Sequence, residues 1–385
     1  MKEYLTSLLE SFVAKEDVAG VNVLVTKDLE PLYQKSLGFA DLENRTPMAP
    51  DTIFRIFSMS KVITSVCMLI LYERGLYKMY DPVEVYLPGF KNQQVASEGV
   101  DGRITLTPAA RPVAIRDLFT MTSGIPYGNE IGYVARRMQE LFEDVAAKEG
   151  TGQCYDTVSL ANAIGQVPLC FQPGAHWMYG LSTDILGALV EVIDGRTLGK
   201  FMREEIFEPL GMRDTGFKMP AEKQGRIAKI YEVEQGYRVF DAKSSGMCEL
   251  ERIESGGGGL MSTAADYTRL CQMLLMGGTL DGQRILGRKT VDLMRTNHLT
   301  DEQRRTSVWE SQRGYGYGLN VRVLQDRATA GSNGSGGEFG WDGMPGTYMC
   351  IDPVEKLTAV YLVGRIPGAH ADFIPRFTAA MYAML

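Results

Sequence analysis

Near the N-terminus, apolar residues recur at helical spacing and are followed by two short β-type runs. Tyr4, Leu5, Leu8, Leu9 and Phe12 share one face of a helix predicted over residues 4–13. The apolar runs 21–26 and 32–39 flank a polar turn at residues 27–31, which is typical of a hairpin.

The last third of the chain repeats this arrangement in reverse. Residues 315–324 alternate as a strand, the runs 346–351 and 357–363 predict a second hairpin, and residues 371–385 predict a closing helix. Helix and hairpin at one end mirror hairpin and helix at the other. We therefore expect one antiparallel sheet, built from both termini and covered on at least one face by the terminal helices.

The middle of the chain shows a different pattern, in which helices predominate. Helical periodicity covers residues 61–72, 182–193, 198–207 and 263–276, with Gly75 and Gly277 as C-terminal stops and Thr263 with Asp266 as a capping pair. Long polar loops are expected at 88–112 and 215–255. The prediction is an α/β (α+β) protein. Residues 1–57 and 256–385 form a discontinuous sheet domain, residues 58–255 form an inserted, mostly helical domain, and the active-site cleft lies between them.

Composition and charge narrow the possible functions. The 385 residues are 45% hydrophobic and 23% charged, as in ordinary globular proteins. A net charge of -7 argues against nucleic acid as a partner, because such binding depends on Lys and Arg neutralising phosphates. No apolar run is long enough for a membrane span. The acidic, amphipathic N-terminal segment does not resemble a secretion signal, so a cytoplasmic protein is expected.

Cysteine and histidine offer no obvious metal chemistry. The six cysteines, Cys248 among them, form no CxxC pair, and we expect buried, reduced thiols. The three histidines form no HExxH or HxH cluster. We therefore predict neither a metal nor a cofactor, and expect His176 to be a packed or surface residue.

A Ser-x-x-Lys motif is the strongest local chemical signal. Ser58 and Lys61 lie three residues apart at the start of an apolar helix, so their side chains share one face. The helix N-terminus favours a developing alkoxide, and a lysine whose pKa is lowered by burial can take the serine proton. The bland alternative is that Ser58 caps the helix and Lys61 is solvated.

Other catalytic schemes match less well. No Gly-x-Ser-x-Gly elbow is present. The segment 195–200 resembles a phosphate loop but is one residue short and lacks the following Ser or Thr. The glycine run 256–259 has no dinucleotide-binding context and is interpreted as a tight re-entry into the sheet domain.

Several ordered motifs resemble the serine β-lactamase and penicillin-binding-protein superfamily on its class C side. The sequence is most similar to the β-lactamase-like family VIII carboxylesterases. The resemblance spans nearly the whole chain and rests on residues 54–61, 81–88, 117–124, 173–179, 208–212, 256–266 and 339–343.

The resemblance implies a role for each matching residue. Ser58 would be the acylated nucleophile and Lys61 its proton-transfer partner. Tyr179 would share the general-base role, with its pKa lowered by Lys61, and later protonate the leaving group. The backbone N–H groups of Ser58 and Met344 would form the oxyanion hole.

Departures from the family pattern bear on the substrate. Tyr179-Gly180-Leu181 replaces Tyr-x-Asn, and Trp341-Asp342-Gly343 replaces Lys-Thr-Gly, so the cation that would hold a substrate carboxylate is missing. Leu181, Trp341, Asp342 and Gly343 are therefore expected to bind substrate. Asp342 either points away from the site or repels anions. Tyr127 follows the Ser123-Gly124 loop and is expected to line the pocket or make a turn.

The leading hypothesis is a serine hydrolase that acts on small carboxylic esters through an acyl-enzyme. The alternative keeps the Ser58-Lys61-Tyr179 site but acts on other substrates, as a β-lactamase, a D-amino-acid peptidase or an acyltransferase. A third hypothesis is a penicillin-sensing module that is acylated without turnover. No nucleic acid or membrane partner is expected, and the sequence does not indicate an oligomeric state.

Overall fold

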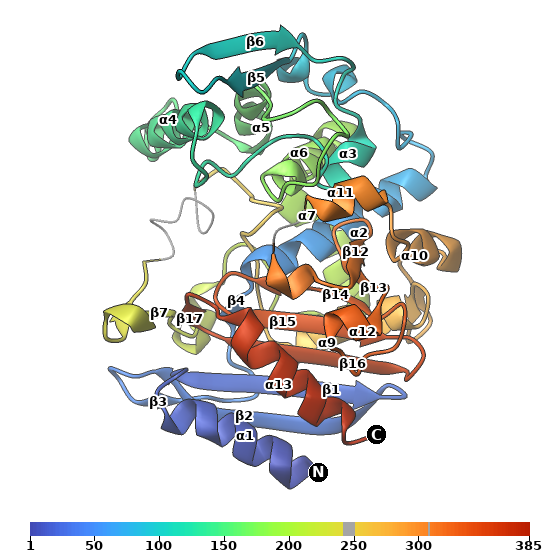
Figure 1. Cartoon of the computed structure of the whole chain (residues 1–385). Coiled ribbons are helices and arrows are strands. Elements are labelled where there is room, and N and C mark those ends of the chain that lie inside the picture. Colours follow the sequence, from blue (N-terminus) through green and yellow to red (C-terminus); the bar gives the residue numbers. More distant parts are fainter. Residues whose placement is uncertain (242–250, 307–308) are drawn as a thin grey trace.

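A computed structural model of the chain describes residues 1–241, 251–306 and 309–385. An eight-stranded antiparallel sheet lies at one end of the molecule (Figure 1), in the order β12-β13-β14-β15-β16-β1-β2-β3. Its strands are β1 (Gly20–Lys27), β2 (Glu30–Asp41), β3 (Thr46–Pro47), β12 (Tyr315–Tyr317), β13 (Arg322–Leu324), β14 (Phe339–Gly343), β15 (Thr347–Asp352) and β16 (Leu357–Val363). β1 pairs with β16, so strands from the two ends of the chain meet inside this sheet, which confirms the predicted sheet.

The strand predicted over residues 315–324 is wrong, because this segment is a hairpin of β12 and β13. The chain reverses at residues 318–321, where the Gly318 N–H donates to the Val321 carbonyl at 2.7 Å. Asn320 has a φ of 60°, in the left-handed region that asparagine tolerates better than most residues. The alternating pattern therefore continues across a turn.

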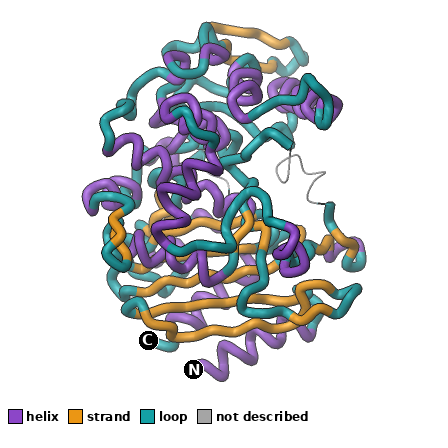
Figure 2. Tube along the Cα trace, turned by 180° about the vertical axis from the view of Figure 1, so that it is seen from behind, coloured by secondary structure: helices purple, strands orange, loops and turns teal. Residues whose placement is uncertain are grey.

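The sheet is covered on both faces. The terminal helices α1 (Lys2–Ala14) and α13 (His370–Tyr382) pack on one face, where Leu5, Phe12 and Phe377 join one hydrophobic core. The helices α2 (Ser60–Glu73), α6 (Ser182–Asp194) and α9 (Ala264–Leu275) belong to a larger core on the other side, which Val360 and Met349 of the sheet also enter. Figure 2 shows the same layers from behind. The division into two domains stays a prediction.

The helices predicted in the middle of the chain correspond to α2, α6, α9 and the segment after residue 197. In that segment α7 (Leu198–Met202) is followed by a π-type turn over Arg203–Phe207. Pro209 has no N–H to donate to the carbonyl of Glu205, which favours a departure from regular helix here. The remaining helices are α3 (Ile115–Phe119), α4 (Tyr133–Lys148), α5 (Thr157–Gly165), α7 (Leu198–Met202), α8 (Glu208–Leu210), α10 (Arg288–Met294), α11 (Asp301–Arg305) and α12 (Arg327–Ala330).

Both segments predicted as long loops contain short regular elements. The first holds a hairpin, and the second holds two short strands, while residues 242–250 lie outside the described part. The smaller sheets pair β4 (Phe54–Arg55) with β9 (Met261–Ser262), β5 (Gln94–Glu98) with β6 (Ile104–Pro108), β10 (Thr279–Leu280) with β11 (Gln283–Arg284), and β7 (Tyr231–Glu232) with both β8 (Arg238–Val239) and β17 (Arg365–Ile366).

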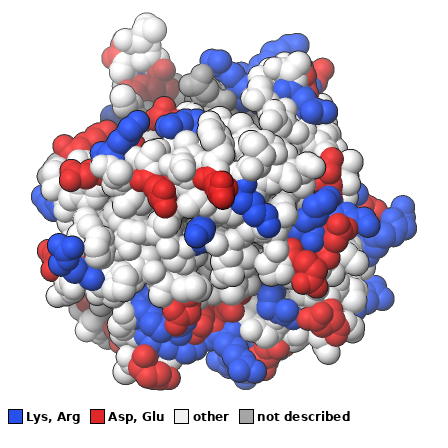
Figure 3. Space-filling view, turned by 90° about the horizontal axis from the view of Figure 1, so that it is seen from below, with Lys and Arg blue, Asp and Glu red and all other residues white. Residues whose placement is uncertain are grey.

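Three of the described cysteines are buried, and the charged side chains are mixed on the surface. Cys67, Cys271 and Cys350 are free and buried as predicted, whereas the free Cys154 and Cys170 are only partly buried; Cys248 lies outside the described residues. Of the helices in the described ranges, none has both the length and the apolar character of a membrane span. Seen from below, acidic and basic side chains are interspersed (Figure 3).

Candidate active site

Ser58 lies in a single 3-10 turn, Phe57–Met59, that leads directly into α2. Its side chain is half-buried at the edge of a cavity, close to the positive end of the helix dipole. The preceding residue, Phe57, has a φ of 43°, which is unusual for a bulky side chain. Such strain persists only where the surrounding structure imposes it, and it frequently marks a functional site.

Lys61 is completely buried, one turn beyond Ser58. Its Nζ atom donates to Ser58 Oγ at 3.2 Å, to the Tyr127 hydroxyl at 2.8 Å and to the Gly257 carbonyl at 2.5 Å. These three bonds use all the donors of an ammonium group. Burial nevertheless lowers the pKa of Lys61 to about 8, against the opposing charge of Asp184. A substantial neutral fraction of the amine therefore exists near pH 8, and this fraction can accept the Ser58 proton.

Two phenols, not one, reach this pair. The Tyr179 hydroxyl accepts a hydrogen bond from Trp341 Nε1 at 3.0 Å, and Lys61 Nζ lies 4.9 Å from the centre of the Tyr179 ring. Tyr127 meets Tyr179 with ring centres 5.6 Å apart, and hydrogen bonds with Ser58 contribute to the electrostatics of both phenols. Tyr127 is thus a direct partner of Lys61, not merely a residue of the pocket wall. The sequence offered no signal for this beyond its place after the Ser123-Gly124 loop.

The protonation of the phenols differs from expectation. Burial raises the pKa of Tyr179, and the hydrogen bonds from Ser58 and Trp341 only partly offset it. Burial likewise raises the pKa of Tyr127 well above its usual value. The expected lowering of the Tyr179 pKa by Lys61 is therefore wrong, because the loss of hydration is the largest influence on this phenol. Both phenols are neutral at physiological pH.

Gly257 and Asp184 also act on the Lys61 amine, the first by a hydrogen bond and the second by its charge. Neither role was predicted from the sequence. The Asp184 carboxylate accepts hydrogen bonds from Ser255 Oγ at 2.6 Å and from the Gly257 N–H at 3.1 Å. A Cβ atom on Gly257 would lie 2.2 Å from that carboxylate, so any larger residue here would displace the Asp184 side chain. The glycine run therefore presents a carbonyl to Lys61, which explains its composition better than a sheet re-entry alone.

Strand β14 forms the opposite wall and brings Gly343 against the backbone before Ser58. A Cβ atom on Gly343 would lie 2.3 Å from the Ile56 carbonyl oxygen and 2.2 Å from Thr347 Oγ1. Only glycine permits this close approach. Ser58, Gly343 and Met344 line the same cavity. The oxyanion hole between the N–H groups of Ser58 and Met344 stays a prediction.

Alternation along β14 sends neighbouring side chains to opposite faces of the sheet. Trp341 is buried on the side of the helices and reaches Tyr179, whereas Asp342 forms an ion pair with the buried guanidinium of Arg322. The Asp342 charge is thus paired with that of Arg322, although Asp342 also lines the cavity and its charge contributes to the raised pKa of Tyr179. The sequence analysis did not identify Arg322 as its partner.

The cavity in front of Ser58 has a volume of about 1300 Å³ and largely aromatic walls. Tyr179 contacts Trp309 with ring centres 4.7 Å apart and Trp341 at 5.4 Å, and Trp177 lies 5.5 Å from Trp309. Leu181 lies in the same wall at the start of α6 and is buried. His176, in contrast, is exposed and packs its ring on Phe171. Such a cavity suits a sizeable, mostly apolar molecule.

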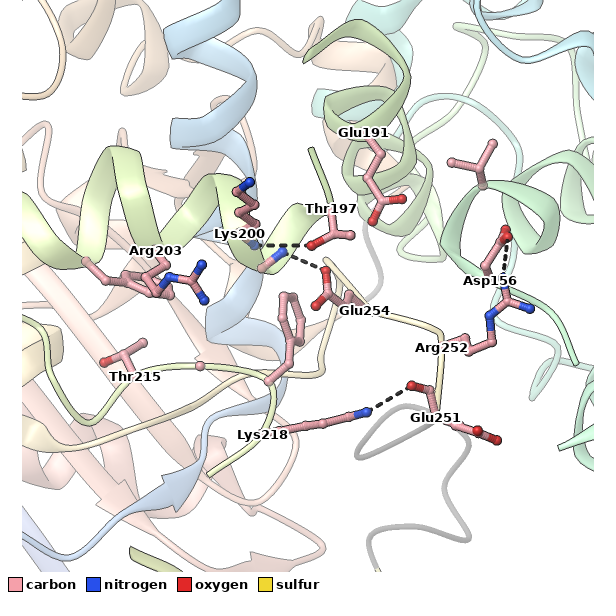
Figure 4. Close-up of a pocket in the computed structure, with 15 residues that line it drawn as sticks. Asp156, Glu191, Thr197, Lys200, Arg203, Thr215, Lys218, Glu251, Arg252 and Glu254 are labelled. Atoms are coloured by element: carbon pink, nitrogen blue, oxygen red, sulfur yellow. Dashed lines mark hydrogen bonds and ion pairs between the residues drawn. The ribbon is translucent and has the colours of Figure 1, made fainter. Parts of the chain in front are cut away.

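A second cavity, of about 800 Å³, lies among α5, α6, α7 and residues 215–218 and 251–254 (Figure 4). Its charged groups are engaged in structural contacts: Glu254 accepts the Gly199 N–H at 2.6 Å, and Arg252 lies 3.5 Å from Asp156. Ser58 does not line this second cavity. Within the described part of the chain, no three His, Cys, Asp or Glu side chains are grouped to hold a metal ion.

Comparison with known proteins identifies the family of the chain. The family model described as Beta-lactamase matches residues 5–379. The chain is 34% identical over 365 residues to Protein Rv1367c of Mycobacterium tuberculosis, covering 92% of this chain and 88% of that protein. It is 27% identical over 376 residues to Esterase EstB of Burkholderia gladioli, covering 93% and 89%.

Solved structures share the fold. The structure of EstCE1, described as a hydrolase with promiscuous acyltransferase activity, superposes with a TM-score of 0.81 at 23% identity, covering 99% of this chain and 98% of that one. At this identity the likeness concerns the fold alone. The match of the family model over residues 5–379 shows that the chain belongs to the Beta-lactamase family, and with Esterase EstB among its relatives the chain is an enzyme of the serine hydrolase type.

Proposed function

We propose that this enzyme hydrolyses carboxylic esters through an acyl-enzyme on Ser58. The observation that carries the proposal is the 3.2 Å contact of Ser58 Oγ with a buried amine whose pKa is lowered to about 8, at the edge of an aromatic cavity. A serine hydroxyl becomes an effective nucleophile when such a base removes its proton.

In the acylation step, Ser58 Oγ bonds to the ester carbonyl carbon while its proton passes to the neutral amine of Lys61. The carbonyl oxygen becomes an oxyanion held by the N–H groups of Ser58 and Met344. Each such donor typically contributes about 10²–10³ in rate. The tetrahedral adduct then loses the alcohol as the C–O bond breaks. Tyr179 gives the departing oxygen a proton and regains one from Lys61, so the amine is neutral again.

Deacylation repeats these steps with water. A water molecule attacks the acyl carbon, and Lys61, directly or through a phenol, accepts the water proton. Breakage of the bond to Ser58 Oγ returns that proton to the serine and releases the carboxylic acid. Tyr127 keeps Lys61 in place throughout, since its hydroxyl accepts from Nζ at 2.8 Å.

Esters are favoured over lactams and D-amino-acid peptides by the composition of the cavity wall. In the resembled family, a lysine or histidine cation holds a substrate carboxylate where this chain has Trp341. Among the described residues that line the cavity, none is lysine or arginine. The likeness to Esterase EstB supports the same choice.

The test combines labelling with a comparison of substrates. Intact-protein mass spectrometry after treatment with a fluorophosphonate should show one adduct on the wild type and none on Ser58→Ala. Values of kcat/KM for p-nitrophenyl butyrate should exceed those for nitrocefin and a D-Ala-D-Ala peptide by about a hundredfold or more. A clear preference for nitrocefin or the peptide would instead favour the β-lactamase or peptidase alternative.

A further inference from the structure

We propose that the Ser58 cavity selects esters that carry a positive charge over neutral esters of the same shape and rejects anionic ones. The inference rests on the proposed ester hydrolysis and names the substrate class for the same site. Acidic and aromatic side chains both line this cavity.

The lining carries acids but very little positive charge. Glu130, Glu143 and Asp342 contribute carboxylates, and His370 is the single basic side chain among the described lining residues. The carboxylate of Asp342 is already paired with the Arg322 guanidinium on the other face of the sheet. The acids that remain to act on a ligand are therefore Glu130 and Glu143.

The catalytic amine does not cancel these two acids. Lys61 is completely buried next to Ser58, and the opposite charge of Asp184 acts on it. The Asp184 charge therefore offsets part of the Lys61 charge. Lys61 does not itself line the cavity, so Glu130 and Glu143 are the charged groups that a ligand there meets first.

Glu130 and Glu143 hold their positions for different reasons. Glu130 is half-buried, and its carboxylate oxygens accept the N–H groups of Gly128 at 2.9 Å and Tyr127 at 3.4 Å. These bonds fix the acid beside the catalytic phenol. Glu143 is exposed on α4, on the helix stripe that faces the cavity with Gln139, Phe142 and Ala146. No ion pair within the described residues engages its carboxylate.

The aromatic walls act in the same direction as the acids. Trp309 is 39% exposed, and with Tyr179 and Trp177 it forms a cluster of rings with centres 4.7–6.2 Å apart. The faces of such rings attract cations, quaternary ammonium groups among them. Two carboxylates and several aromatic rings in one cavity are complementary to a cationic substrate that is otherwise apolar.

Isosteric esters separate charge from shape. On the alcohol side, butyrylcholine is compared with 3,3-dimethylbutyl butyrate, in which carbon replaces the charged nitrogen, and with the anionic butyrate ester of 3-hydroxypropanesulfonate. On the acyl side, the p-nitrophenyl ester of 4-(trimethylammonio)butanoic acid is compared with that of 5,5-dimethylhexanoic acid. In at least one series kcat/KM should favour the cation about tenfold, which corresponds to about 1.4 kcal/mol. The anionic ester should be the poorest substrate.

Variants test whether Glu130 and Glu143 cause the preference for cationic esters. Glu143→Gln should lower the cation-to-neutral ratio about threefold, and Glu130→Gln combined with Glu143→Gln should bring it close to one. Glu140→Gln is the matched control, because Glu140 lies on the same helix, is exposed, pairs with Arg137 and does not line the cavity. The wild-type ratio should also fall as salt is raised, since exposed charges are screened.

The outcomes distinguish the two proposals. If no ester in either series is turned over, ester hydrolysis is wrong and the charge selectivity falls with it. If the neutral esters are turned over but the ratio is one or lower in both series, only the charge selectivity is overturned. A cation preference that survives in the double variant would show that Glu130 and Glu143 do not create it, which also refutes the inference.

Discussion

The buried position of Lys61 predicts how the activity changes with pH. Only the neutral amine can accept the Ser58 proton, and burial lowers its pKa from 10.5 to about 8. Below this pKa the neutral fraction falls tenfold per pH unit. We therefore expect kcat/KM to be about a hundredfold lower at pH 6 than at its plateau above pH 8, with a midpoint of about 8.

The assay is the hydrolysis of p-nitrophenyl butyrate from pH 5.5 to 9.5, followed at the isosbestic wavelength of nitrophenol and nitrophenolate. Asp184→Asn supplies the structural test. Because the Asp184 charge raises the pKa of Lys61, its removal should move the midpoint to lower pH. Asparagine keeps an acceptor for Ser255 and Gly257, so their hydrogen bonds have a partner in the variant.

One control variant and two possible results test whether Lys61 and Asp184 set the midpoint of the pH profile. Asp194→Asn, at the other end of α6, removes a carboxylate that pairs with Arg196 and should leave the midpoint where it is. A profile that is flat between pH 6 and 8 would show that Lys61 is not the base. A midpoint that rises in Asp184→Asn would show that the Asp184 charge does not raise the pKa of Lys61.

Three further changes have expected outcomes. Lys61→Met should abolish activity yet stabilise the fold at pH 7. The shift from 10.5 to about 8 corresponds to a penalty of about 3 kcal/mol for the buried charge, less what its hydrogen bonds contribute. The free energy of unfolding of the wild type should rise towards that of the variant as pH rises from 8 towards 10.5, because the buried amine loses its charge. Urea unfolding at pH 7 and 9.5 measures this difference. Trp341→Phe keeps a ring but loses the bond to Tyr179, so kcat should fall about tenfold with unfolding changed by about 1 kcal/mol. Gly343→Ala forces β14 away from Ile56, and should lower kcat at least a hundredfold in the same ester assay.

Local patterns in the sequence were sufficient for much of the fold. The first helix, the two hairpins and the closing helix follow from residue spacing, since an amphipathic period is decided by neighbours along the chain. The same holds for the pairing of Ser58 with Lys61, because a spacing of three brings both onto one helix face. The hairpin of β12 and β13 was not predicted, because the alternation of apolar and polar residues continues through the turn. Only the left-handed conformation of Asn320 marks the place where the chain reverses.

The tertiary structure alone decided what surrounds the nucleophile. Tyr127 and Gly257 reach Lys61 across 66 and 196 residues of sequence, and no local pattern encodes such contacts. Burial, which no single segment determines, raises the pKa of the phenols and lowers that of the amine. Alternation predicts that Trp341 and Asp342 face opposite ways, but only the packed sheet gives Asp342 its partner Arg322. Spacing along the chain thus determined which groups are present, while packing determined their protonation and their partners.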